Sequence, residues 1–182
     1  MAPPIASPPL EPLQDVVSRL ERAGLVCALG GSGLLASLGL ANSVRDWDLT
    51  TDEPLERAIE AIEDLQPGRV GPDGLHADHK LLVRGGEIEL IVGFAIGTSE
   101  DIVRLPTLVT GRWRGVPLGS PEVWAVAYAL MERDEKASAL FRLLGRRGAD
   151  PAAVARLARE PLPAALREKL VSLPRRATSS NT

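Results

Sequence analysis

Leu29-Gly30-Gly31-Ser32 and, after thirteen further residues, Asp46-Trp47-Asp48 are the stretches that decide the fold we expect for this chain. A Gly-Gly pair lets the backbone turn sharply, because no Cβ stands in the way. The first stretch therefore predicts a turn between a buried strand and a helix. In the second stretch, alternation along an extended strand puts the two acids on one face and Trp47 on the other. Two neighbouring acids repel each other unless a cation lies between them, so the pair favours a divalent metal bound to a polyphosphate.

Apolar spacing predicts the elements around these stretches. We expect a helix over residues 10–23, strands over 25–29 and 46–50, and helices over 32–40 and 52–65. Further strands are expected over 80–84, 87–95, 108–113 and 116–118, with Gly85-Gly86 as a hairpin turn between the first two. Helices should follow over 123–133, 135–145, 150–159 and 162–171. This order predicts an α/β (α+β) fold, a mixed sheet flanked by helices with a helical C-terminal part.

The chain length suits one domain with a small helical appendage. We expect a disordered Pro- and Ala-rich tail over residues 1–9, a core over 10–119, a helical part over 120–172 and a flexible tail over 173–182.

Composition narrows the classes of partner. The net charge is −3, but residues 142–182 carry nine basic and three acidic side chains. We interpret this basic region as a solvated helical surface, so a nucleic acid partner is allowed but not favoured. Aromatic residues make up only 3% of the chain, which argues against extensive base stacking.

The single cysteine, Cys27, lies in an apolar run and rules out an intrachain disulfide. We see no signal peptide and no apolar run long enough to span a bilayer, so we expect a cytoplasmic protein with no membrane partner. The sequence leaves the oligomeric state open.

A third carboxylate is expected near the acid pair, because phosphoryl and nucleotidyl transfer usually use one near the attacking oxygen. Glu87 and Glu89 alternate onto one face of the same predicted strand, so the pattern alone does not choose between them. We favour Glu89, because it lies inside an apolar run, where a carboxylate is costly unless it has a partner or a function.

Several other side chains are candidates for the same site. The backbone amides of Gly30 and Gly31, the Ser32 hydroxyl and the N-terminus of the following helix would together bind an anion. Arg45 could bind phosphate or form a plain salt bridge. Lys80, or alternatively His79, could reach substrate phosphate from the strand beside Glu89.

Three further groups of residues are better explained without a ligand. His76 and His79 are interpreted as loop residues rather than metal ligands. Trp113 is interpreted as an exposed hairpin residue rather than a nucleobase platform. Trp124 and Tyr128, four residues apart on a helix, should pack inward.

The motif Leu29-Gly30-Gly31-Ser32, Asp46-Trp47-Asp48 and the later Ile88-Glu89-Leu90-Ile91 resembles the signature of the polymerase-beta-like nucleotidyltransferase superfamily over about residues 25–145. The stretch from Arg45 to Asp52, with Pro54, is similar to tRNA nucleotidyltransferases, although this chain is too short for their helical body.

The resemblance implies roles for the motif residues. Gly31 and Ser32 would contact nucleotide phosphates. Asp46 and Asp48 would bind two Mg²⁺ ions, for which Mn²⁺ can substitute, and Glu89 would bind one of them and help activate the acceptor hydroxyl. The family's usual third acid is Asp, so Glu89 departs from the pattern.

These observations predict a nucleotidyltransferase that moves a nucleoside monophosphate from a nucleoside triphosphate to an acceptor hydroxyl on a small molecule or protein. The acceptor and the base preference stay open. The alternatives are an inactive nucleotide-binding module of the same fold, such as half of a toxin–antitoxin-like pair, and an interaction protein that uses the basic helical tail.

Overall fold

The computed structural model describes residues 6–71 and 77–176, and the chain divides into two compact units, Met1–Ser120 and Pro121–Thr182. The first unit holds a seven-stranded mixed sheet in the order β3-β4-β5-β2-β1-β9-β8 and a separate β6–β7 hairpin. The pairs β2–β5 and β1–β9 are parallel, and the other pairs of the large sheet are antiparallel. The predicted mixed α+β fold is confirmed.

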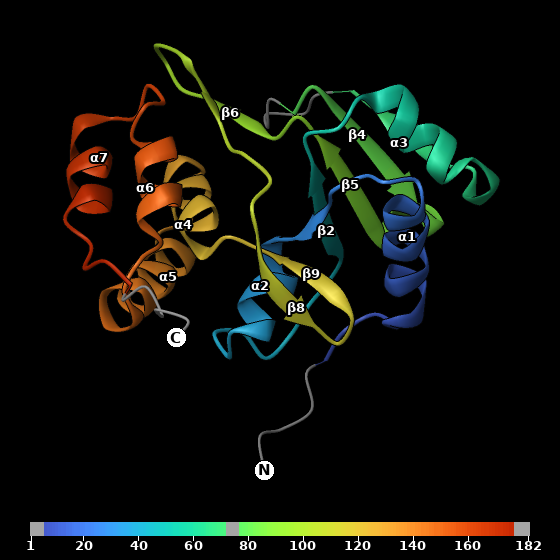
Figure 1. Cartoon of the computed structure of the whole chain (residues 1–182), viewed down its shortest axis with the longest axis horizontal. Helices are drawn as coiled ribbons and strands as arrows, with labels where there is room; N and C mark the ends of the chain where they lie inside the picture. The colour runs from blue at the N-terminus through green and yellow to red at the C-terminus, as the bar shows by residue number, and fades with distance from the viewer. Residues whose placement is uncertain (1–5, 72–76, 177–182) are drawn as a thin grey trace, which may run out of the picture. The chain divides into compact units, whose positions relative to one another are not determined.

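The strands are β1 Ala28–Leu29, β2 Trp47–Thr51, β3 Gly68–Val70, β4 His79–Val83, β5 Ile88–Val92, β6 Ala95–Gly97, β7 Ile102–Arg104, β8 Val109–Trp113 and β9 Val116–Gly119. The helices of this unit are α1 Glu11–Arg22, α2 Gly31–Ser37 and α3 Leu55–Ala61, with short 3₁₀ turns η1 Glu63–Leu65 and η2 Arg84–Gly86. Figure 1 shows β2, β5 and β4 side by side, with α1 and α3 next to them.

One face of the sheet is packed against α1 and α3. Trp47, Leu49, Leu81, Ile88 and Leu90 are fully or almost fully buried there. They form one cluster with four α1 residues (Leu13, Val16, Val17, Leu20), with Ala58 of α3 and with Ile62, which directly follows α3. Because side chains alternate along a strand, the residues between them point to the other face. That other face carries Asp48 and Glu89, two of the predicted acids.

Several elements are shorter than the sequence predicts. Only Ala28–Leu29 of the expected first strand pairs with neighbours, and α2 ends at Ser37. The helix expected over 52–65 begins after Pro54, whose ψ of 138° is extended, and gives way to η1. Gly93 interrupts the strand expected over 87–95, because its φ of +65° turns the chain between β5 and β6. Strands β3 and β7 were not predicted.

The chain before α1 is tied to the rest of the first unit. The backbone of Ala6 donates to Asn42 at 3.1 Å and accepts from Val44 at 2.7 Å, and the Trp47 indole donates to the Pro9 carbonyl at 3.2 Å. These contacts fall in the segment expected to be a disordered tail. Residues 1–5, which belong to the same prediction, lie outside the described residues.

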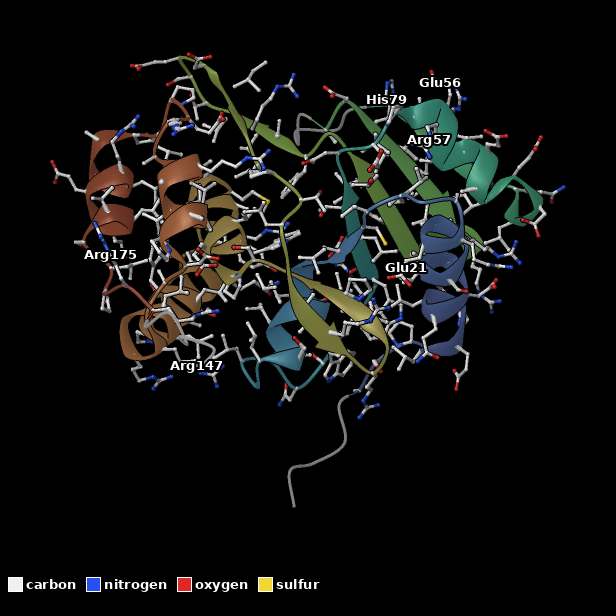
Figure 2. The ribbon with its side chains drawn as sticks, in the orientation of Figure 1. Glu21, Glu56, Arg57, His79, Arg147 and Arg175 are labelled. Carbon is white, nitrogen blue, oxygen red and sulfur yellow. The ribbon has the colours of Figure 1, made fainter. Side chains whose placement is uncertain are left out.

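Contacts between elements distant in sequence fix this packing. Arg112 of β8 donates to Glu21 of α1 at 2.7 Å, and this hydrogen bond raises the pKa of Arg112 above its usual value; Glu21 is labelled in Figure 2. Cys27 is buried as predicted, and burial raises the pKa of its thiol to about 12. A thiol in this state is an inert part of the core.

The second unit consists of the helices α4 Pro121–Leu130, α5 Asp134–Arg147, α6 Pro151–Leu157 and α7 Ala164–Val171, which confirms the predicted helical C-terminal part. Trp124 and Tyr128 pack inward with ring centroids 5.6 Å apart. The buried Glu122 carboxylate accepts from the Asp150 backbone amide at 2.8 Å, and Asp150 caps α6. Across the described residues no helix is both long and apolar enough to cross a membrane.

The core packing makes a stability prediction. Leu20→Ala should lower the free energy of unfolding by about 2–5 kcal/mol, because it leaves a cavity between α1 and the sheet. Urea unfolding followed by circular dichroism measures this loss. Val26→Ala is the control, since Val26 is 51% exposed in the same unit and should change the free energy by less than about 0.5 kcal/mol. Equal losses in both variants would contradict this packing.

Candidate functional site

The Gly-Gly turn and β2 touch directly. The Gly30 amide donates to the Asp48 carbonyl at 2.8 Å, and the next residue, Gly31, starts α2 with a φ of +53°. A Cβ on Gly31 would lie 1.7 Å from Oδ2 of Asp48, so the carboxylate rests against the glycine backbone. Only glycine combines this backbone conformation with so close an approach.

Asp48 and Glu89 face each other across two neighbouring strands. The parallel register of β2 and β5 pairs Asp48 with Glu89, flanked by the pairs Trp47–Ile88 and Leu49–Leu90. The flanking pairs point into the core, so both carboxylates lie on the opposite face, on strands about 4.8 Å apart. The structure therefore brings together two of the three predicted acids.

Glu87 differs from Glu89 in its surroundings. It lies before β5 with helical backbone angles (φ −61°, ψ −28°), so strand alternation does not apply to it. Its carboxylate accepts from the Arg84 guanidinium at 3.1 Å, and its side chain is 45% exposed. This placement supports the choice of Glu89.

Asp46 lies just before β2, two residues upstream of Asp48. Its carboxylate is 22% exposed and accepts from the guanidinium of Arg45 at 3.3 Å. The Arg45 side chain is 90% exposed, and an ion pair this open to water is weak. Asp46 is therefore available to a competing cation. Of the two roles that the sequence left open for Arg45, the structure shows the salt bridge.

Lys80 of β4 binds Glu89 directly. Its ammonium lies 2.9 Å from Oε2 of Glu89, and the two side chains are only 12% and 22% exposed. The sequence assigned Lys80 to substrate phosphate and did not foresee this pairing. The antiparallel register, which places Leu82 opposite Glu89 and Lys80 opposite Ile91, makes Lys80 a diagonal neighbour of Glu89.

The Ser32 hydroxyl is a buried polar atom without a hydrogen-bond partner among the described residues. It lies in the first turn of α2, next to Gly31. A buried hydroxyl with no partner costs free energy, so such an atom calls for an explanation. A phosphate oxygen bound at this turn would supply the missing partner.

The donor set fits a divalent cation in its chemistry. Carboxylate oxygens are the ligands that Mg²⁺ prefers, and Mg²⁺ usually takes one or two of them together with substrate phosphates. Within residues 6–71 and 77–176, no three His, Cys, Asp or Glu side chains are grouped so as to hold a metal ion by themselves. The residues thus fit a cation that a bound triphosphate helps to hold.

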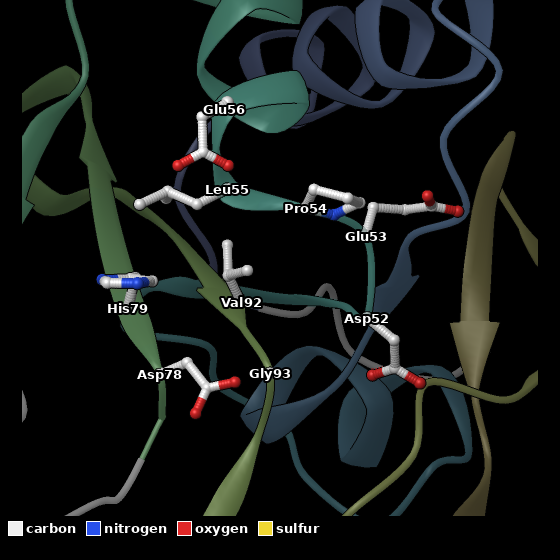
Figure 3. A pocket seen from close by; sticks show the side chains of 9 residues that line it. All are labelled: Asp52, Glu53, Pro54, Leu55, Glu56, Asp78, His79, Val92 and Gly93. Atoms are coloured by element: carbon white, nitrogen blue, oxygen red, sulfur yellow. The ribbon is translucent and has the colours of Figure 1, made fainter.

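A pocket of about 520 Å³ lies at the other end of the same strands (Figure 3). Residues 52–56, which follow β2, line one part of it, and Asp78, His79, Val92 and Gly93 line the rest. Asp52 and Gly93 follow the C-terminal ends of β2 and β5, whereas Asp48 and Glu89 lie near the N-terminal ends. His79 is exposed at the start of β4, and His76 lies outside the described residues.

Trp113 is half-buried, which corrects its interpretation as an exposed hairpin residue. Its ring packs against Trp47 with centroids 6.3 Å apart, and the Arg114 guanidinium lies 4.9 Å from its centre. Packing against a core residue gives Trp113 a structural role.

Comparison with known proteins identifies the fold. No protein-family model matches the chain, and no curated protein sequence matches it. A crystal structure from Thermotoga maritima, whose nucleotidyltransferase assignment is itself inferred, is 22% identical over 76% of this chain and 93% of its own, with a TM-score of 0.52. ANT(2″)-Ia in complex with adenylyl-2″-tobramycin is 17% identical over 90% of this chain and 97% of its own, with a TM-score of 0.54. Both likenesses are below 25% identity, and they confirm the predicted fold, which this chain shares with these structures.

The contact between Gly31 and Asp48 makes a second prediction. Gly31→Ala should destabilise the fold by more than Gly39→Ala, as measured by urea unfolding. Both glycines have positive φ, so each variant carries a backbone cost of about 1–2 kcal/mol. A Cβ at Gly39 meets nothing within 4 Å, whereas a Cβ at Gly31 overlaps the Asp48 carboxylate. Equal destabilisation would show that the carboxylate moves aside without cost.

Proposed function

We propose that this protein transfers a nucleoside monophosphate from a Mg²⁺-bound nucleoside triphosphate to an acceptor hydroxyl and releases pyrophosphate. The observation that carries this proposal is the register pairing of Asp48 with Glu89 beside the Gly30-Gly31 turn. An anion-binding turn next to two carboxylates matches the two needs of a chelated triphosphate. The nucleotidyltransferase fold is consistent with this chemistry.

In this mechanism the chain's own residues position the reactants. The turn from Gly30 to Ser32 would bind phosphate oxygens, and Asp46 and Asp48 would hold the cation. The cation would supply positive charge to offset the charge of the phosphates. Glu89 accepts the proton of the acceptor hydroxyl. The acceptor oxygen then bonds to the α-phosphorus, and the bond from that phosphorus to the pyrophosphate oxygen breaks.

Removing the two aspartates tests the cation site. Asp46→Asn with Asp48→Asn should abolish Mg²⁺-dependent binding of a nucleoside triphosphate in calorimetric titration, because the cation loses its carboxylate ligands. Glu56→Gln with Glu60→Gln is the matched control, since both glutamates are exposed on α3 and the change in charge is the same; Figure 2 labels Glu56. Unchanged binding in the aspartate variant would contradict the proposal.

Ser32 provides a separate test of the phosphate turn. Ser32→Ala should leave the free energy of unfolding unchanged or raise it, because the hydroxyl has no partner among the described residues. The same variant should weaken triphosphate binding about tenfold, the effect of losing one hydrogen bond to a charged group. Urea unfolding and calorimetry measure the two effects. A loss of stability with unchanged affinity would assign the hydroxyl to the fold instead.

A nucleotide-binding module without transferase activity is the second candidate. The Lys80–Glu89 ion pair favours it, because the ammonium competes with a proton or a cation for the Glu89 carboxylate. Pyrophosphate release in the presence of candidate acceptors, including an aminoglycoside such as tobramycin, separates the two candidates. Triphosphate binding without release, for every acceptor tried, would support the module.

A further inference from the structure

We propose that Lys80 is a built-in counter-ion that occupies Glu89 in the cation-free protein, and that a divalent cation entering the site displaces it. This inference deepens the proposed function and rests on it only for the identity of the site. It gives Lys80 a positioning role, because the Glu89 carboxylate becomes available to a cation or an acceptor only as the ammonium leaves it.

The strand register places the three charged side chains in a row. Lys80, Glu89 and Asp48 come from the adjacent strands β4, β5 and β2, and all three alternate with core residues. Like charges directly opposite each other on neighbouring strands are destabilising. A lysine bound to Glu89 reduces the repulsion between the two carboxylates while no cation is present.

Burial makes this ion pair stronger than a surface pair. The Lys80 side chain is 12% exposed and the Glu89 side chain 22%, with the ammonium and carboxylate 2.9 Å apart. Salt and water screen such a pair less than they screen the Arg45–Asp46 pair, in which the arginine is 90% exposed. Glu89 is therefore held in the cation-free state, whereas Asp46 is held weakly.

A divalent cation competes with the Lys80 ammonium for the Glu89 carboxylate. At the spacing of this ion pair, two positive charges in a partly buried site repel each other strongly. The lysine side chain is a flexible four-carbon stem, so its head can leave Glu89 without moving β4. Cation binding therefore weakens the Lys80–Glu89 pair and favours displacement of the ammonium.

The lysine content of this chain allows a test without mutation. The sequence contains three lysines, Lys80, Lys136 and Lys169. Acetylation of each lysine in the full-length protein can be followed by mass spectrometry in a Mg²⁺ titration with a non-hydrolysable nucleoside triphosphate present, and the triphosphate without Mg²⁺ is the control. Lys80 should react slowly without Mg²⁺ and several-fold faster when Mg²⁺ saturates the site. Lys136 and Lys169, which lie over the rings of Tyr128 and Phe141, are internal controls whose rates should stay constant.

Mutation tests the competition directly. Lys80→Met should tighten Mn²⁺ binding, measured by electron paramagnetic resonance, by about tenfold or more, because the competing charge is gone. Lys80→Arg keeps the charge and should retain the weak binding. Adding Glu89→Gln to Lys80→Met should remove the gain. Arg84→Gln removes one positive charge at the end of β4, where Arg84 pairs with Glu87, and should leave Mn²⁺ affinity unchanged.

The outcomes separate this inference from the proposed function. Two results would overturn the proposed exchange of Lys80 for a cation at Glu89. One is Mg²⁺ binding with no change in the acetylation rate of Lys80, and the other is no cation binding by either the wild type or Lys80→Met. Pyrophosphate release with Lys80 still unreactive at saturating Mg²⁺ would overturn the exchange and leave the proposed function standing. Mg²⁺-dependent exposure of Lys80 without any triphosphate binding would support the exchange and remove the proposed function.

Discussion

The parallel pairing of β2 with β5 decides which side chains meet on each face of the sheet. Trp47 and Ile88 pair on the face packed against α1 and α3, so Asp48 and Glu89 must pair on the other. A slip of either strand by one residue would turn that strand's own carboxylate into the apolar core. The hydrophobic core and the candidate site are therefore specified by the same register, and neither can shift without the other.

A second constraint holds the Gly-Gly turn against this pair of strands. Gly31 has no side chain, and its positive φ lets α2 begin directly beside the Asp48 carboxylate. The neighbouring Gly33 is close to Leu29 and Trp47, where a Cβ would lie 2.9 Å and 3.1 Å from their side chains. The two glycines therefore have different roles. Gly31 brings the backbone next to the Asp48 carboxylate, and Gly33 lets α2 pack closely on the core.

The sequence could predict local features of the site but not its long-range ones. Gly85-Gly86, interpreted as a two-residue turn, already implies the β4–β5 register in which Lys80 is diagonal to Glu89. The β2–β5 register was not accessible, because the paired residues, such as Asp48 and Glu89, are 41 positions apart and alternation alone treats Glu87 and Glu89 alike. The short strands β3 and β7 carry too few residues for a pattern, and the break at Gly93 depends on a backbone angle that composition does not reveal.

The charge balance of the site also relates the two candidate functions to each other. Because Lys80 neutralises Glu89 in the cation-free protein, the fold does not require a bound cation to offset two adjacent carboxylates. A binding module and a transferase can then share this structure and differ in one equilibrium, the exchange of Lys80 for a cation at Glu89. If the exchange is unfavourable even with a triphosphate present, Asp46 and Asp48 can still hold a chelated nucleotide, but no carboxylate is available to the acceptor. If the cation and phosphates together outcompete the ammonium, the same side chains complete a transfer site.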